Sequence, residues 1–356
     1  MIYGERIRQA RELNGFTQTQ LSEAAAVKQA AISQIESGAS QPSPPVLAAI
    51  ADKTGFPAEF FSRPPRQDFA LGSLLFRQHK TSTATDAKKA HRWGEIIDEA
   101  AALLAESLEP RAVKIPVMPG ASPLEAATAT RSALGLGPNI PITNLTLFVE
   151  RAGVVVFVLP LDLERHQAYS LWTGDDLNRP VIALMRGLPG DRQRFSLAHE
   201  LGHLVLRHRE SPDIEEHADM FAAELLTPAE VLRDEMHPPI TLACLARLKR
   251  RWGVSMQSLA RRAKELGYVS ERQYRYLFQQ ISGQGWRKHE PDAVPIERPR
   301  AFRQMAEMLY GNPVDVRTLA RDLGLNELTV REILREGAGA LQPHVPGSNV
   351  SHLRAR

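Results

Sequence analysis

The segment from Arg194 to Arg207 reads RFSLAHELGHLVLR and contains a His-Glu-x-x-His pattern, formed by His199, Glu200 and His203. Residues four apart on an α-helix lie on the same face, so the two imidazoles can converge on one metal ion. Glu200 can then reach a water bound to that ion, and a carboxylate beside a zinc-polarised water is the arrangement of metallopeptidases. Apolar residues at helical spacing around the motif predict that it lies on a buried helix.

A catalytic zinc requires a third protein ligand and one open position. A further His six residues after the second His is one known source, but Arg209 occupies that position and excludes it. The segment 214–228 reads as a second helix, on which Glu215 and Asp219 lie four residues apart. One of these carboxylates can bind the metal while the other accepts a hydrogen bond from a ligating imidazole. Glu215 is the preferred ligand, and the competing residues on this helix are Glu216, His217 and Glu224.

The two helices together, RFSLAHELGHLVLRH followed by EEHADMFAAELLTP, resemble the ImmA/IrrE family of zinc-dependent endopeptidases over roughly residues 67–290. The resemblance implies that His199, His203 and Glu215 bind Zn²⁺ and that Glu200 is the general base. With Glu215 as the ligand, Asp219 is the carboxylate expected to accept a hydrogen bond from a ligating imidazole. Thr227 stands where Met is common in the family, a departure that does not touch the chemistry. Two imidazoles and one carboxylate favour zinc over Mn²⁺ or Fe²⁺.

The first 61 residues read as five short helices, two of them joined by a tight turn in the helix-turn-helix plan. In that plan the second helix of the pair enters the DNA major groove. Gln29 can pair with adenine and Lys28 with guanine or phosphate, while Gln18 can anchor the first helix to a phosphate. Short or polar residues suited to the groove follow along the second helix: Ala30, Ser33 and Gln34. Apolar residues mark where the pair should pack together: Ala24, Val27, Ile32 and Ile35.

The stretch LNGFTQTQLSEAAAVKQAAISQIESGASQPSPPVLAAIADKTG resembles the phage-repressor-like (Cro/C1, or XRE) DNA-binding domain over its whole length. The resemblance implies that the chain binds double-stranded DNA at a pseudo-palindromic operator as a homodimer. The alternative is a helical interaction module whose polar face is merely solvated.

Between these two regions the sequence predicts a long amphipathic helix over 85–108, further helices over 123–134 and 144–152, and strands over 153–159, 169–172 and 180–185. A small sheet directly before the His-Glu-x-x-His helix can hold an extended peptide along an edge strand. A donor to the oxyanion of a tetrahedral intermediate is also needed. The sequence does not choose among four candidates for it: His166, Tyr169, Arg194 and His237.

The segment 244–289 carries eleven Lys and Arg against two acids. Such a face can contact DNA phosphates or steer an acidic partner, and it can equally be a solvated surface. A Pro-rich link over 290–299 leads to three short helices, over 301–309, 315–323 and 328–335, with a weak helix-turn-helix rhythm at 316–330. The end of the chain is predicted to be disordered.

These patterns predict a mainly α fold with a small sheet (α+β) in three parts. Residues 1–66 form the five-helix Cro/C1-type domain, 67–290 the zincin-like metallopeptidase domain with its basic tail, and 291–356 a small helical C-terminal region. A single cysteine, Cys244, excludes an intramolecular disulfide. With no signal peptide and no membrane-spanning stretch, we expect a cytoplasmic protein without membrane contact.

The leading functional hypothesis is a DNA-binding transcription regulator whose zinc endopeptidase domain cleaves a protein in response to a signal. The substrate is expected to be a repressor, or the chain itself near the Pro-rich link at 62–66. The alternative is a non-catalytic metal- or ligand-sensing repressor or antitoxin-like regulator that keeps the zincin fold. The intact Glu200 favours the enzyme, because a purely structural zinc has no use for a general base.

Overall fold

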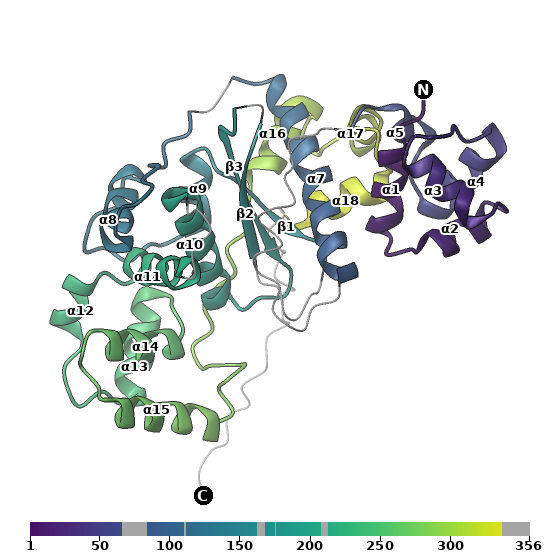
Figure 1. Ribbon diagram of the computed structural model, residues 1–356. Coiled ribbons are helices and arrows are strands. Elements are labelled where there is room, and N and C mark those ends of the chain that lie inside the picture. The colour runs from purple at the N-terminus through teal and green to yellow at the C-terminus, as the bar shows by residue number, and fades with distance from the viewer. Residues whose placement is uncertain (66–83, 110–111, 162–167, 175, 208–212, 337–356) are drawn as a thin grey trace, which may run out of the picture.

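The computed structural model describes residues 1–65, 84–109, 112–161, 168–174, 176–207 and 213–336. Over these ranges the chain is mainly helical and contains one small sheet near its centre (Figure 1). The predicted mainly α fold with a small sheet is confirmed. None of the helices in the described ranges is long and apolar enough to cross a membrane.

The sheet has the strand order β1-β3-β2, so β3 (Arg179–Met185) lies in the middle. β1 (Val155–Leu159) runs parallel to β3, and β2 (Ala168–Thr173) runs antiparallel to it. The three predicted strands are therefore confirmed to within about two residues. Among the described residues, β2 pairs with a strand on one side only.

Successive side chains of the strands point to opposite faces of the sheet and into two different apolar cores. Val156, Ile182 and Leu184 face the helices that carry the His-Glu-x-x-His motif. Phe157 and Ala183 face the opposite core, which includes residues of the N-terminal helices and of the helices between 301 and 336. Because both faces are covered, β1 and residues 180–185 of β3 are continuously apolar rather than alternating.

The N-terminal module consists of five helices, as predicted: α1 (Gly4–Leu13), α2 (Gln18–Ala24), α3 (Gln29–Glu36), α4 (Pro44–Thr54) and α5 (Ala58–Ser62). Thr17 caps α2 in a reciprocal pair with Gln20, which supplies partners for amides that the first turn leaves unpaired. Ile32 and Ile35 of α3 are buried as expected. The expectation for Ala24 is wrong: Ala24 is exposed, because Ala25 takes the packing position.

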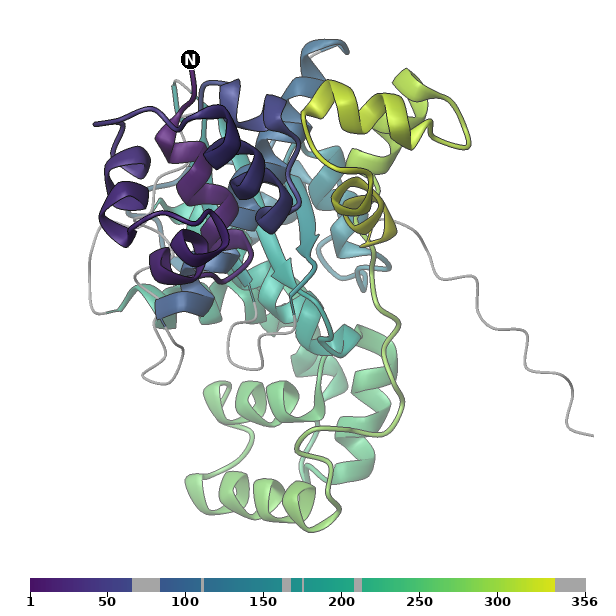
Figure 2. The same ribbon diagram turned by 90° about the vertical axis from the view of Figure 1, so that its right-hand side faces the viewer.

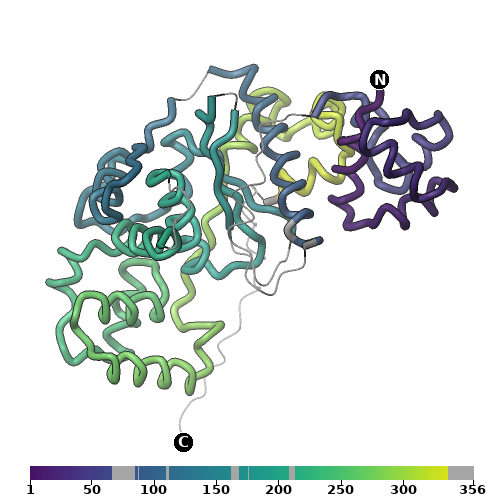
Figure 3. Tube along the Cα trace, in the orientation of Figure 1, coloured from purple at the N-terminus to yellow at the C-terminus, as the bar shows by residue number. Residues whose placement is uncertain are grey.

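The long helix α7 (Ala84–Glu106) lies between the N-terminal module and the sheet (Figure 1). On the other face of the sheet lie the helices of the first core: α8 (Pro123–Ala133), α9 (Leu145–Arg151), α10 (Gly190–Leu206) and α11 (Ile214–Leu226). A further group lies beyond α11, at the opposite end of the molecule from the N-terminal module (Figure 3): α12 (Ala229–Glu235), α13 (Leu242–Trp252), α14 (Met256–Glu265) and α15 (Glu271–Gly283).

Residues 290–300, here called the strap, connect α15 to the C-terminal helices and run along the side of the molecule (Figure 2). At its start, Glu290 accepts hydrogen bonds from the Lys249 ammonium at 2.9 Å and from the backbone amide of Met256 at 2.6 Å. Lys249 is almost fully buried and also binds Asp191 of α10 at 2.6 Å. The strap therefore satisfies a buried charge beside the motif helix.

Farther along the strap, Glu297 forms a buried ion pair with Arg194 of α10. Glu297 also accepts a hydrogen bond from the backbone amide of Thr146 at 2.8 Å, in the first turn of α9. Gly190, the first residue of α10, has no side chain because a Cβ there would come within 2.2 Å of the Val294 carbonyl oxygen. The strap thus packs directly on the N-terminal end of the motif helix.

The described part of the chain finishes with three helices, here called the C-terminal bundle: α16 (Ala301–Tyr310), α17 (Val316–Leu323) and α18 (Glu327–Glu336). The bundle contacts α7 and β1. It also meets the N-terminal module, where Arg63 donates hydrogen bonds to the carbonyls of Asp322 at 2.8 Å and Arg321 at 3.1 Å. Asn326 donates to the carbonyl of Gly55 at 2.6 Å. The three predicted regions are in extensive contact, and their independence as domains stays a prediction.

Candidate metal centre and nucleic-acid interface

The helix α10 carries the His-Glu-x-x-His motif and is buried along most of its length. Leu197, Leu201 and Val205 pack into the core between the sheet and α11. Gly202 allows the close approach of α11, because a Cβ at this position would lie 2.9 Å from the ring of Phe221. This close packing brings the two helices that carry the predicted ligands together.

Three ligand atoms converge between α10 and α11. The Nε2 atoms of His199 and His203 lie 3.2 Å apart. The carboxylate oxygens of Glu215 lie 3.5 Å from His199 Nε2 and 3.4 Å from His203 Nε2. All three ligand atoms fall within 4.8 Å of one another, so a single ion between them can contact each. Two imidazole nitrogens and one carboxylate are the donors of a His₂Glu catalytic zinc site, so these residues fit zinc.

Asp219 lies behind the ligands, where its Oδ1 is 2.7 Å from His199 Nδ1. This contact leaves His199 Nε2 for the metal, since a ligating imidazole donates its other N–H to a carboxylate. The second oxygen of Asp219 accepts a hydrogen bond from Arg261 of α14 at 2.9 Å. Burial raises the pKa of the Asp219 carboxyl, but His199 and Arg261 outweigh burial and hold the pKa below its ordinary value. Asp219 therefore stays ionised as the hydrogen-bond acceptor.

Glu200 is 1% exposed and points its carboxylate to the edge strand β2. There Ser170 lies 2.7 Å from the Glu200 Oε2 atom and 3.1 Å from the Glu200 backbone carbonyl, through its hydroxyl oxygen. A carboxylate held in this way is fixed relative to both the motif helix and the strand.

The competing residues on α11 have other surroundings. Glu216 is exposed and His217 is half-buried. Glu224 forms an ion pair with Arg262 and accepts a hydrogen bond from the backbone amide of Ala229 at 3.2 Å. None of these three residues is part of the three-residue ligand cluster.

The candidates for the oxyanion donor differ in their surroundings. Tyr169 lies in the core on the other face of the sheet and donates to the Ala90 carbonyl at 3.3 Å. Arg194 is buried against Glu297, and His237 is exposed. His166 lies outside the described residues. Tyr169 and Arg194 are therefore structural residues here.

The predicted DNA-contacting residues lie on one face of the N-terminal module. Along α3 and at its N-terminal end five side chains are exposed: Lys28, Gln29, Ala30, Ser33 and Gln34. Gln18 at the start of α2 is half-buried and accepts a hydrogen bond from Gln29 at 2.6 Å. Packing of the module on α7 uses α1, and within the described ranges the five side chains of this face are exposed.

Most of the positive charges of the basic segment 244–289 are paired with acidic side chains. Seven of its eleven Lys and Arg residues make ion pairs: 249, 250, 251, 261, 262, 264 and 275. Most of the acidic partners come from outside the segment, among them Asp191, Asp219 and Glu224. The structure therefore favours the interpretation of a neutralised surface over a nucleic-acid contact.

Two residues of the site were missed by sequence reasoning, Ser170 and Arg261. Ser170 is an unremarkable strand residue, and Arg261 was counted only as part of the basic segment. Their contacts with Glu200 and Asp219 join positions 30 and 42 residues apart. No pattern among neighbouring residues in the sequence predicts partners at such separations.

Two family models match the chain. Residues 7–61 match the helix-turn-helix model, and residues 149–264 match the model of the IrrE N-terminal-like domain, a peptidase family. No curated protein matches the chain at a significant level. The range 149–264 includes the sheet and four residues of the candidate site: His199, Glu200, His203 and Glu215. α7, the strap and the C-terminal bundle lie outside both matched ranges.

Proposed function

We propose that this chain, in which an XRE-type helix-turn-helix domain is joined to an ImmA/IrrE-type peptidase domain, is a transcription regulator with a zinc-dependent endopeptidase site. The observation that carries the proposal is the convergence of His199, His203 and Glu215 beside the buried Glu200. A structural zinc site is closed by four protein ligands, whereas three ligands next to a carboxylate leave a position for water or substrate.

Each residue of the site has a defined task in peptide hydrolysis. His199, His203 and Glu215 would hold zinc, which when bound would supply Lewis-acid activation. Asp219 orients His199 and fixes its tautomer. Glu200 takes the proton from the attacking water and delivers it to the leaving amine, as a general base and then a general acid. Ser170 steadies the Glu200 carboxylate between these two transfers.

The substrate class follows from the strand next to the site. β2 has one edge without a strand partner in the described part of the chain, and Ser170 of this strand contacts Glu200. An extended peptide added along that edge would lie across the motif helix, with its main chain held by strand-like hydrogen bonds. We propose a protein substrate with an extended segment: a repressor, or this chain itself near 62–66.

The experiment that tests the enzyme is a comparison of metal content and proteolysis. Plasma mass spectrometry should find about one zinc per chain in the wild type and none in His203→Ala or Glu215→Ala. Glu200→Gln should retain zinc and lose cleavage of a candidate repressor. If regulation in cells survives Glu200→Gln, the chain is a metal-sensing regulator rather than a protease.

The DNA-binding part of the proposal has its own test. Selection from a random duplex library with the wild-type chain should enrich a pseudo-palindromic DNA site, bound by a homodimer. The reason is that the exposed α3 face of one protomer can read only one half-site of the DNA. Gln29→Ala should relax base preference at one position of each half-site. Enrichment of no sequence would contradict operator binding.

A further inference from the structure

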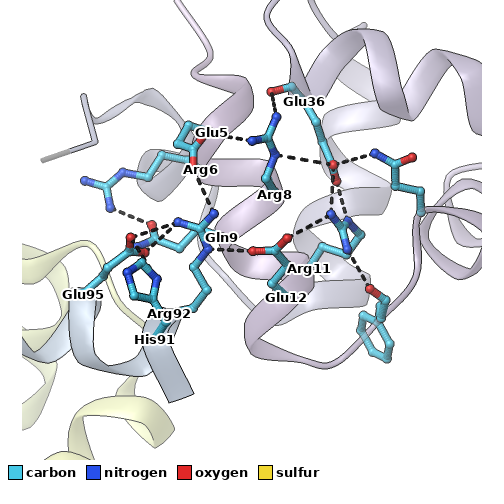
Figure 4. A network of polar contacts seen from close by, with 12 residues as sticks. Glu5, Arg6, Arg8, Gln9, Arg11, Glu12, Glu36, His91, Arg92 and Glu95 are labelled. Atoms are coloured by element: carbon cyan, nitrogen blue, oxygen red, sulfur yellow. Dashed lines mark hydrogen bonds and ion pairs between the residues drawn. The ribbon is translucent and has the colours of Figure 1, made fainter. Parts of the chain in front are cut away.

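Arg92 of α7 lies at the centre of the contact between α7 and the N-terminal module (Figure 4). Its Nε donates to Glu12 at 2.7 Å, and its Nη2 donates to Glu5 at 3.0 Å, both on α1. Its Nη1 donates to Glu95 on its own helix at 2.8 Å. One guanidinium therefore binds two carboxylates of the DNA-binding module from a helix outside that module.

Each of these two carboxylates, Glu12 and Glu5, begins a chain of polar contacts inside the module. Glu12 lies 3.5 Å from Arg11, whose Nε donates to Glu36 at 2.6 Å. Glu5 lies 3.4 Å from Arg8, whose Nη2 donates to the backbone carbonyl of Glu36 at 3.3 Å. Both paths end on Glu36, the last residue of α3.

Glu36 in turn holds the two glutamines of the DNA-contacting face. Gln18 donates to Glu36 Oε2 at 2.8 Å, and Gln29 donates to the Gln18 side-chain oxygen at 2.6 Å. The amide orientation of Gln29 decides whether it can pair bidentately with adenine. Four hydrogen bonds and the Glu12–Arg11 ion pair thus connect Arg92 to Gln29, the side chain predicted to read a base.

The charged groups along the path through Glu12, Arg11 and Glu36 are shielded from solvent. The side chain of Glu36 is 1% exposed, and those of Arg92, Arg11 and Glu12 are 11%, 11% and 12% exposed. Burial lowers the pKa of the Arg92 guanidinium, but the charges of Glu95 and Glu12 outweigh burial and raise it above its ordinary value. Water screens such buried ion pairs poorly, so the bonds within a network of this kind strengthen one another.

The other side of α7 rests on the peptidase half of the molecule. α7 contacts β1 and α16, and Arg179 of β3 donates to Asp98 of α7 at 2.6 Å. α7 lies outside the matched helix-turn-helix range, so this anchor belongs to the fused architecture of the chain.

We propose that Arg92 is a positioning residue for DNA recognition: it orients Gln18 and Gln29 through Glu12, Arg11 and Glu36, so that α7 sets the affinity for the operator. The proposal rests on the proposed operator binding. It makes α7 the element through which the peptidase half acts on the DNA-contacting face.

The test is a double-mutant cycle on the full chain, with fluorescence anisotropy on the duplex enriched by the wild type. Arg92→Ala should weaken binding on the order of tenfold, within the usual range of coupling between sites. Arg92→Ala combined with Gln18→Ala should be no weaker than Gln18→Ala alone, because both remove the same arrangement. The salt dependence should not change, since the Arg92 guanidinium is 11% exposed and binds carboxylates of the protein.

Lys88→Ala is the matched control, an exposed charge on the same helix, and should bind like the wild type. Should Arg92→Ala fail to fold, Glu12→Gln and Arg92→Lys take its place in the cycle with the same expected non-additivity. Unchanged affinity, or effects of the two positions that simply add, would overturn the proposal. A wild type that enriches no duplex contradicts operator binding itself, which is a separate result.

Discussion

At the scale of single residues, the candidate metal centre depends on side chains that never touch the ion. Asp219 fixes His199 and is itself held by Arg261, and Ser170 holds Glu200. Such outer residues set the orientation and basicity of the ligands. Their substitution should change metal affinity and catalysis without disturbing the core.

Asp219→Asn is expected to weaken zinc binding by roughly ten- to a hundredfold, because the amide is a poorer acceptor for the His199 N–H. Competition with a chelator of known affinity measures the change. Glu216→Gln, an exposed acid on the same helix, is the control and should keep wild-type affinity. Equal affinity in the two variants would mean that Asp219 does not support the ligand.

At the scale of elements, the site requires a close approach of α10 and α11, and the position of α10 is held by the strap. Gly202 allows the close approach of the two helices. Glu297 of the strap holds α10 in place through its ion pair with Arg194. Both features can be tested by unfolding, without a substrate.

Gly202→Ala is expected to destabilise the fold by about 1–3 kcal/mol, because the added methyl overpacks the interface with the buried Phe221 ring. Helix propensity alone would predict the opposite sign, a gain of roughly 1 kcal/mol. Gly283→Ala in α15, where a Cβ meets no atom within 4 Å, is the control and should be neutral or slightly stabilising. Urea denaturation gives both values, and a stabilised Gly202→Ala would contradict the close packing.

Glu297→Gln is expected to lower stability by about 3–5 kcal/mol, because it leaves the Arg194 charge buried and uncompensated. The side chains of this pair are 4% and 6% exposed. Asp292→Asn in the same strap is the control: its partner Arg250 is 57% exposed, so the loss should be about 1 kcal/mol or less. Similar midpoints of denaturation for both variants would show that the strap adds little.

At the scale of the whole molecule, the C-terminal bundle closes the second core. Leu319, Val330 and Ile333 of the bundle share that core with Phe60 and Phe61 of the N-terminal module. The same core includes residues of α7 and one face of the sheet. The bundle therefore joins the DNA-binding half to the peptidase half.

A chain truncated after residue 290 is expected to aggregate or to bind a dye for exposed apolar surface. The truncation uncovers apolar side chains of α7, β1 and α5 and also removes the partner of Arg194. Size-exclusion chromatography and dye fluorescence check this against the full chain. A soluble fragment with an unchanged cooperative melting transition would instead support residues 291–356 as a separate domain.

The sequence by itself determined most of the helices and strands of this protein and pointed to the three candidate ligands that the structure brings together. Helical periodicity predicted α10 and α11, the Thr17 cap marked the start of α2, and a uniformly apolar run marked β1. The spacing of His199 and His203 placed two imidazoles on one helix face, where the structure finds them. These signals are local, because capping, propensity and periodicity depend on residues a few positions apart.

Only the tertiary structure decided which distant charges pair. Ser170 meets Glu200, Glu297 meets Arg194 across 103 positions, and Arg92 meets Glu12 across 80. The basic segment 244–289 is likewise neutralised by acids that lie elsewhere in the sequence. A buried charge must find a partner, but packing of the whole chain determines which one lies within reach. The strap contacts, the anchor on α7 and the contacts of Ser170 with Glu200 and of Arg261 with Asp219 could therefore be recognised only once the chain was folded.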